Sequence, residues 1–187
     1  MALTRARRTP PPLTQSALDE LAVRYVGRYA TTRAKLRAYL KRKLRERGWA
    51  GEGEADIDAL ASRFSELGYI DDASYALSKS RALSGRGYGK RRLAEKLREA
   101  GVDENDSRAA FDAADAEAVD AALRFARRRR IGPFAVQRAE RPEREKWIAA
   151  MLRAGHGFAL ARAIASLAPG ATVDPADLRE SNRFDAN

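Results

Sequence analysis

The stretch GKRRLAEKLREAGV, residues 89–102, decides the fold because the chain contains it in three versions. The other two are LRAYLKRKLRERGW, residues 36–49, and REKWIAAMLRAGHG, residues 144–157. The three versions align on Gly48, Gly101 and Gly155. In each version an apolar side chain stands four and eight residues before the glycine. This spacing predicts an amphipathic helix that ends on a glycine in a left-handed conformation.

The repeat organises the whole chain. The aligned glycines stand 53 and 54 residues apart, and helical periodicity precedes and follows each version, with no alternating strand pattern. The expected helices span residues 16–29, 32–47, 55–67, 71–84, 89–100, 103–114, 115–130, 142–154 and 157–167. We therefore predict an all-α protein of three tandem three-helix repeats, at residues 16–68, 69–114 and 115–168. A disordered basic N-terminal arm (residues 1–15) and a polar C-terminal tail (residues 169–187), which frays or is disordered, complete the prediction.

The composition points to an acidic or polyanionic partner. The chain has 187 residues, a formal net charge of +10 and an isoelectric point near 10.3. Such a balance favours nucleic acid, an acidic protein or an anionic membrane surface. There is no cysteine, which is typical of a reducing compartment. Since no apolar run has the length of a membrane span and the start does not resemble a secretory signal, we expect a cytoplasmic protein without a membrane partner.

The segment GYIDD, residues 68–72, could be a metal site or punctuation between two helices. Gly68 would end one helix, Tyr69 and Ile70 would pack back on it, and Asp71 or Asp72 would cap the next helix. Capping accounts for every residue of the segment, and no further ligands are signalled nearby. We interpret GYIDD as structural.

The segment SGRGYGKRR, residues 84–92, resembles a phosphate-binding loop only superficially. Arg91 follows Gly89-Lys90 where such a loop needs Ser or Thr, and Lys90 stands where a dinucleotide fingerprint needs its third glycine. Two interpretations stay open. The segment is a flexible joint between helices, or it is a basic elbow whose glycines let the backbone approach a partner.

Basic side chains are segregated along the chain. Residues 31–49 and residues 79–98 each hold eight basic side chains against one acid, and RRRR at residues 127–130 adds a third cluster. Repeated clusters on successive repeats suggest an extended electropositive track rather than scattered solubilising charge. The expected partner-binding residues are Arg33, Arg37, Lys41, Arg45, Lys79, Arg81, Arg86, Tyr88, Lys90, Arg91, Arg92, Arg127 and Arg128.

Signatures of catalysis, of metals and of cofactors are missing. His156 is the only histidine, which excludes a histidine-rich metal site, and no nucleophile elbow or His-Glu-x-x-His pair occurs. We expect a non-enzymatic protein that needs no cofactor and no metal.

The central segment resembles the signature of the RecX family of recombination regulators. That signature runs from Gly-aromatic-aliphatic-Asp-Asp through a basic helix and Gly-aromatic-Gly to a Leu-rich helix. The matching residues are Gly68, Tyr69, Ile70, Asp71, Asp72, Tyr75, Arg81, Gly87, Tyr88, Gly89, Leu93, Leu97, Gly101 and Val102. The resemblance is specific over residues 17–114 and weaker to residue 168. It implies an elongated, curved array of three-helix repeats.

The resemblance also implies a function. A RecX protein would bind the RecA recombinase, notably its filament on single-stranded DNA, and would mainly inhibit its ATPase, strand-exchange and co-protease activities in DNA repair, recombination and the SOS response. Direct contact with single- or double-stranded DNA is also possible, and we expect a monomer. The alternatives are a transcription regulator of helix-turn-helix type, which the scarcity of Asn and Gln in the basic helices disfavours, and a basic enzyme such as a nuclease.

Overall fold

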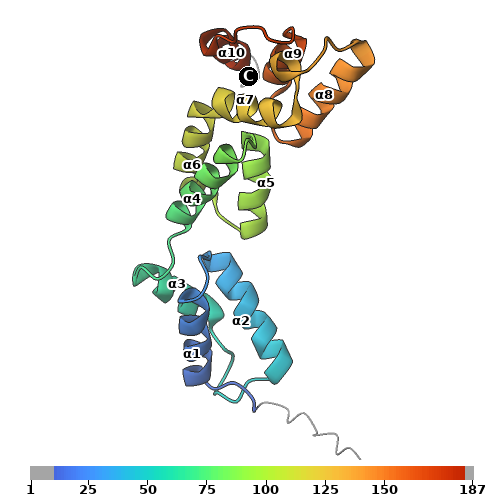
Figure 1. Cartoon of the computed structure of the whole chain (residues 1–187). Coiled ribbons are helices and arrows are strands. Elements are labelled where there is room, and N and C mark those ends of the chain that lie inside the picture. Colours follow the sequence, from blue (N-terminus) through green and yellow to red (C-terminus); the bar gives the residue numbers. More distant parts are fainter. Residues whose placement is uncertain (1–10, 184–187) are drawn as a thin grey trace, which may run out of the picture. The chain divides into compact units, whose positions relative to one another are not determined.

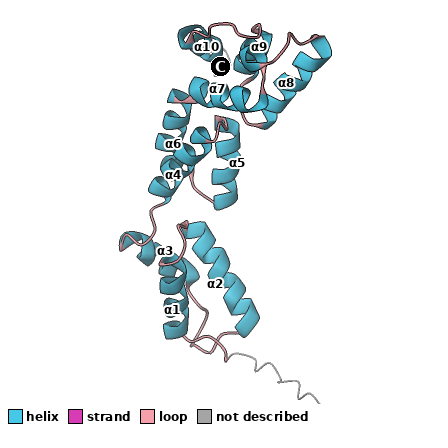
Figure 2. Ribbon diagram, in the orientation of Figure 1, coloured by secondary structure: helices cyan, strands magenta, loops and turns pink. Residues whose placement is uncertain are grey.

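The computed structural model describes residues 11–183, and within them it contains helices and no β-strand (Figures 1 and 2). The elements are α1 (Gln15–Val26), α2 (Arg33–Arg47), α3 (Ile57–Glu66), α4 (Asp72–Gly85), α5 (Lys90–Ala100), α6 (Glu104–Ala116), α7 (Ala118–Arg129), the 3-10 helix η1 (Gly132–Phe134), α8 (Arg141–Arg153), α9 (Phe158–Ser166) and α10 (Pro175–Arg183). The prediction of an all-α protein is confirmed. None of the helices in this part of the chain is both long and apolar enough to cross a membrane.

The helices form two compact units, one ending at Tyr75 and the other beginning at Ala76. Each unit has its own hydrophobic core. The predicted boundaries of the three repeats, at residues 68/69 and 114/115, stay predictions. The thirteen residues expected to bind a partner are distributed over both units.

The first unit is built on the apolar stripe of α2. Leu36 and Leu40 are fully buried and pack with Leu18 of α1 and Phe64 of α3. Thr14 and Thr32 are the N-caps of the first two helices, because the hydroxyl of each accepts a backbone N–H of the first turn. Asp56 does the same for α3. Local capping and one shared stripe therefore define this three-helix core.

The prediction of a disordered N-terminal arm is wrong for residues 11–15. Leu13 is fully buried, its amide donates to the carbonyl of Gly48, and its own carbonyl accepts the amide of Ala50, both at 2.9 Å. The guanidinium of Arg47 also donates to the carbonyl of Pro11. The segment is ordered because one leucine fills the core of the first unit and its backbone is hydrogen-bonded. Residues 1–10 lie outside the described residues.

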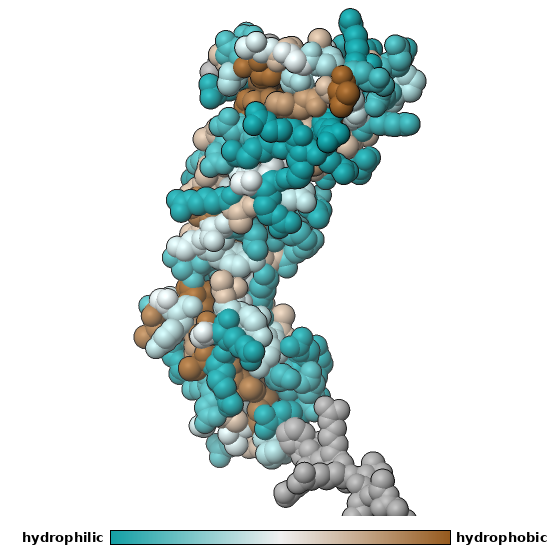
Figure 3. Space-filling view, in the orientation of Figure 1, coloured by the Kyte–Doolittle hydropathy of each residue, from teal (hydrophilic) through white to brown (hydrophobic). Residues whose placement is uncertain are grey.

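The second unit gathers its largest core around α7, α8 and α9. Phe125, Met151 and Ile164 are buried there. On the surface, hydrophilic colours predominate on the face of each unit that Figure 3 shows. The predicted disordered tail is wrong for residues 175–183, which form α10. Leu178 of this helix is only 4% exposed and packs into the same core, against α7 and α9.

The glycine register of the repeats is observed in the backbone. The φ angles of Gly48, Gly101 and Gly155 are 80°, 67° and 94°. Gly101 is fully left-handed, with a ψ of 30°, whereas the ψ of 173° at Gly48 turns the chain into an extended segment. The positive φ angles are confirmed at all three positions, and the left-handed helical conformation is wrong for Gly48.

Candidate interaction surfaces

The two aspartates of GYIDD have different roles. Asp71 caps α4: its carboxylate accepts the amide of Ser74 at 2.8 Å and the hydroxyl of Ser74 at 2.7 Å. These hydrogen bonds lower the pKa of the Asp71 carboxyl below its ordinary value. The expected cap is therefore confirmed for Asp71.

Asp72 serves α2 instead. Its side chain is buried, one oxygen accepts the backbone N–H of Arg33 at 3.0 Å, and the other lies 3.3 Å from the Nε of the same residue. Arg33 is the first residue of α2, so the carboxylate satisfies an amide that the helix itself leaves open. This contact fixes the guanidinium of Arg33 within the first unit.

The basic stripe of α2 is divided into two halves. Arg33 is paired with Asp72, and Arg37 lies 2.7 Å from the carboxylate of Asp58. Lys41 and Arg45 are exposed, and neither has an ion-pair partner among residues 11–183. The C-terminal half of the stripe is therefore the more open half.

The cations of α4 also differ in exposure. Lys79 is half-buried, whereas Arg81 is exposed. Of the two, Arg81 presents its charge more fully to solvent.

The glycines of SGRGYGKRR let the backbone of this segment pack closely against other parts of the second unit. Gly87 and Gly89 are buried, and the amide of Gly89 donates to the carbonyl of Ala154 at 2.9 Å. A Cβ at Gly87 would lie 2.8 Å from the backbone nitrogen of Phe125, and one at Gly89 would overlap the carbonyl of Gly155. Close packing is therefore a physical reason for glycine at positions 87 and 89, and the flexibility of the segment stays a prediction.

A buried histidine supports the same segment. The Nε2 of His156 lies 3.1 Å from the carbonyl oxygen of Gly87, and its ring lies 5.6 Å from that of Phe125. Burial lowers the pKa of His156 to about 4, against the opposing effect of the hydrogen bond to Gly87. The ring is therefore neutral at pH 7 and donates Nε2–H to the carbonyl.

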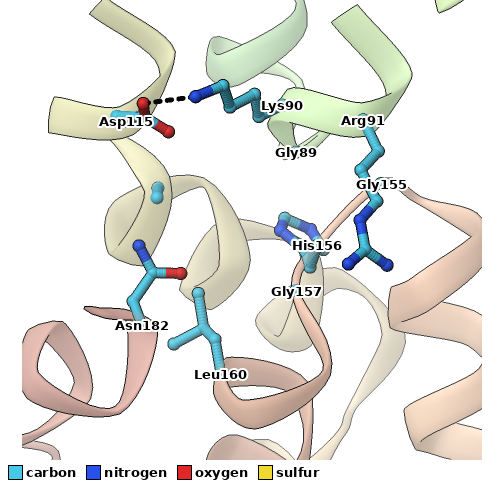
Figure 4. A pocket seen from close by; sticks show the side chains of 10 residues that line it. Gly89, Lys90, Arg91, Asp115, Gly155, His156, Gly157, Leu160 and Asn182 are labelled. Atoms are coloured by element: carbon cyan, nitrogen blue, oxygen red, sulfur yellow. Dashed lines mark hydrogen bonds and ion pairs between the residues drawn. The ribbon is translucent and has the colours of Figure 1, made fainter. Parts of the chain in front are cut away.

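Around this packed backbone, the basic side chains diverge (Figure 4). Lys90 pairs with Asp115 at 2.5 Å, whereas the Arg91 side chain points in a different direction, past Gly155. Arg92 pairs with Glu95 at 2.7 Å. Lys90 and Arg91 both line a pocket of about 120 Å³. Arg91 is exposed and has no ion-pair partner in the described part of the chain, so it is the more available of these two cations.

The end of α7 joins this surface. Arg128 donates to the carbonyl of Arg86 at 2.7 Å, and the guanidinium of Arg86 lies 5.5 Å from the centre of the half-buried Tyr88 ring. Arg127 lies 5.0 Å from the ring of Phe134. The structure therefore brings the elbow and the third basic cluster together within the second unit.

Two arginines of this surface were not among the expected residues. Arg129 and Arg153 line a depression of about 360 Å³ together with Tyr88 and Arg128. Arg153 stands two residues before Gly155, and the aligned position is glutamate in the other two versions of the repeat, Glu46 and Glu99. This change of charge within the repeat is the signal that could have predicted Arg153.

Comparison with known proteins agrees with this description. A family model described as "RecX, second three-helix domain" matches residues 71–110. The "Regulatory protein RecX" of Myxococcus xanthus (strain DK1622) is 33% identical over 168 residues, which cover 86% of this chain and 90% of the relative. That of Thermobifida fusca (strain YX) is 37% identical over 129 residues, 66% of this chain and 68% of the relative. The crystal structure of RecX from Lactobacillus salivarius has the same fold, with a TM-score of 0.59 at 21% identity over 80% of this chain and 92% of that chain.

The fold and its surfaces define an all-α helical-repeat protein with exposed basic clusters. The similarity to the Myxococcus xanthus relative, which extends over most of both chains, identifies the family. The chain belongs to the RecX family of regulatory proteins.

Proposed function

We propose that this protein binds RecA and the RecA filament on single-stranded DNA, and that it mainly inhibits the ATPase, strand-exchange and co-protease activities of the filament in DNA repair and recombination. The observation that carries the proposal is the similarity to a RecX protein over 86% of the chain. The regulation is by binding, without catalysis, and the protein acts as a monomer.

The exposed cations supply a physical basis for the proposed binding. The thirteen expected residues remain the proposed contact set, and the exposed ones are Lys41, Arg45, Arg81, Arg86, Lys90, Arg91, Arg127 and Arg128. Exposed charges each contribute little and are screened by salt. A filament presents the same acidic and phosphate groups many times, so several weak contacts add up to a higher effective affinity.

The first test is ATP hydrolysis by RecA on single-stranded DNA, titrated with this protein at two salt concentrations. We expect inhibition that weakens at the higher salt concentration, because surface charges carry the contact. An unchanged hydrolysis rate at saturating protein would contradict the proposal. Sequence-selective binding to duplex DNA in the same preparation would then favour the helix-turn-helix alternative, and metal-dependent cleavage would favour a nuclease.

A matched pair of variants locates the contact. In the first, Arg86, Lys90, Arg91 and Arg92 are replaced by Ala. In the second, Ala replaces four exposed cations of the second unit that lie outside the proposed set, Arg108, Arg138, Arg162 and Arg179. Both variants lose four charges, so a loss of long-range attraction affects them equally. We expect the first to need about tenfold more protein for half-inhibition than the second. Equal inhibition by the two variants would remove the elbow from the interface.

A further inference from the structure

The first unit contains a second basic surface, which the proposed contact set does not include. It lies between α1 and α2, which pack against each other (Figure 1). We name it the tyrosine groove and define it by Tyr25, Tyr29, Tyr39, Arg28, Arg42 and Lys43. The groove is an open depression of about 720 Å³. Arg24 also lines the depression, but its guanidinium pairs with Glu20 at 3.0 Å. Three aromatic rings and three further cations, Arg28, Arg42 and Lys43, therefore line one hollow.

The three rings of the groove are spatial neighbours, with Tyr25 between Tyr39 and Tyr29. Tyr25 and Tyr39 are stacked, with centroids 4.3 Å apart and an angle of 13° between their planes, and both also pack against the core of the first unit. Tyr29 lies 5.5 Å from Tyr25, is tilted by 52°, and is 52% exposed. Core packing explains the first two rings. It does not explain Tyr29, which presents an aromatic surface to whatever enters the groove.

The cations surround these rings. The guanidinium of Arg28 lies 5.7 Å from the centre of the Tyr29 ring, and Arg42 and Lys43 lie 5.6 Å and 5.9 Å from that of Tyr39. Glu46 pairs with two of these three cations: it lies 2.6 Å from Lys43 and 3.6 Å from Arg42. One exposed carboxylate cannot neutralise three cations, so the groove keeps a positive charge.

This combination of rings and cations identifies a class of ligand. Single-stranded nucleic acids offer bases that stack on aromatic rings and phosphates that pair with Arg and Lys. A duplex offers phosphates but keeps its bases stacked on one another, and an acidic peptide offers charge without flat rings. We propose that the tyrosine groove binds single-stranded nucleic acid directly, with a base on Tyr29 and phosphates on Arg28, Arg42 and Lys43. The proposal is independent of any effect on RecA.

The probe is a fluorescently labelled oligo-dT of about 12 nucleotides, a length within the range that one single-strand-binding fold covers. Its binding to the full chain is measured by fluorescence anisotropy without RecA and compared with that of an abasic strand of equal length and of a duplex. We expect oligo-dT to bind at least about 5-fold more tightly than the abasic strand, which carries the same phosphates but no bases.

Variants separate stacking from charge. Tyr29→Leu should raise the Kd for oligo-dT at least about 5-fold and leave the Kd for the abasic strand unchanged, whereas Tyr29→Phe should bind like the natural protein. Tyr69→Leu is the matched control, because Tyr69 is 61% exposed in the same unit but lies outside the groove. The double variant Arg28→Ala/Arg42→Ala should weaken both strands and reduce the slope of log K against log salt by roughly 1.4.

Two results would overturn the proposal. The first is equal binding of oligo-dT and the abasic strand together with an unchanged Kd for Tyr29→Leu, which would show attraction by charge alone. The second is that the protein binds a polyglutamate peptide and does not bind oligo-dT, and that Tyr29→Leu weakens the binding of the peptide. Circular dichroism checks that each variant is folded. Since RecA is absent, neither result bears on the regulation of ATP hydrolysis.

Discussion

Gly89 and Gly155 meet backbone against backbone in the second unit. The amide of Gly89 donates to the carbonyl of the residue before Gly155, and a Cβ on either glycine would overlap main-chain atoms of the other segment. No side chain can relax this overlap by changing its rotamer. The contact therefore predicts a strict requirement for glycine at both positions.

Gly89→Ala should destabilise the protein by about 1–3 kcal/mol or more, because the new methyl group forces main-chain segments apart. Thermal unfolding followed by circular dichroism measures the change. Gly85→Ala is the matched control: a Cβ there meets nothing within 4 Å, and the position ends α4, so the stability should stay the same or rise slightly. Equal melting temperatures for the two variants would contradict the requirement for glycine at position 89.

Asp72→Ala should lower the free energy of unfolding by about 1–3 kcal/mol, because a buried carboxylate that accepts two bonds from Arg33 is lost. Urea unfolding provides the measurement. Asp71→Ala removes an exposed helix cap and should cost about 1 kcal/mol. Replacement of Glu66, which is exposed, should change little. A smaller effect at position 72 than at position 71 would be inconsistent with the link between α4 and α2.

Because His156 is buried and neutral, we expect the free energy of unfolding to fall in mild acid. Its pKa is about 4 in the folded protein and about 6.5 in the unfolded chain, so between these values the unfolded chain binds the extra proton. The stabilisation is complete above pH 6.5 and is lost as the pH falls toward 4, by roughly 3 kcal/mol in all. Urea unfolding of the natural protein and of His156→Gln at pH 7 and pH 4.5 tests this. The difference between the two should shift in favour of the variant at pH 4.5, and a constant difference would exclude titration of His156 as the cause.

Leu178→Ala should destabilise the second unit by about 2–5 kcal/mol, because the leucine of α10 is buried in the shared core. Arg179→Ala changes the exposed neighbour and should have almost no effect. Chemical denaturation of both variants gives the comparison. If both had the stability of the natural protein, α10 would contribute nothing to the core.

Most of the fold could be predicted because its signals are local. Leu40, Leu93 and Leu97 follow helical spacing before a glycine, and all three are buried, so periodicity alone located the central helix of the first two repeats. The same spacing in the third version placed Met151 correctly in the core.

The ordered ends could not be predicted in this way. Leu13 and Leu178 are single leucines in segments that are otherwise polar or rich in proline. A single apolar residue has no periodicity, and each of these segments is ordered only because the folded core offers a place for it. Tertiary packing, and not local propensity, decides such segments.

The candidate surfaces were predictable as charge but not as geometry. The sequence shows where Arg33, Arg37 and Lys90 stand, but their partners Asp72, Asp58 and Asp115 are 39, 21 and 25 residues away. Which cation remains open depends on where the fold places each acid. For the same reason the tyrosine groove, whose residues come from α1, α2 and the loop between them, could not be found from the basic clusters alone.

The bond between Asp72 and Arg33 also bears on how RecX-type repeats can be duplicated or exchanged during evolution. A cut at the predicted repeat boundary after residue 68 would separate the first helix bundle from the carboxylate that completes it. A cut after Tyr75 would keep that carboxylate with its partner and coincide with the division between the compact units. The unit of inheritance would then be longer than the unit of sequence repetition, because the first repeat is completed by the opening residues of the second.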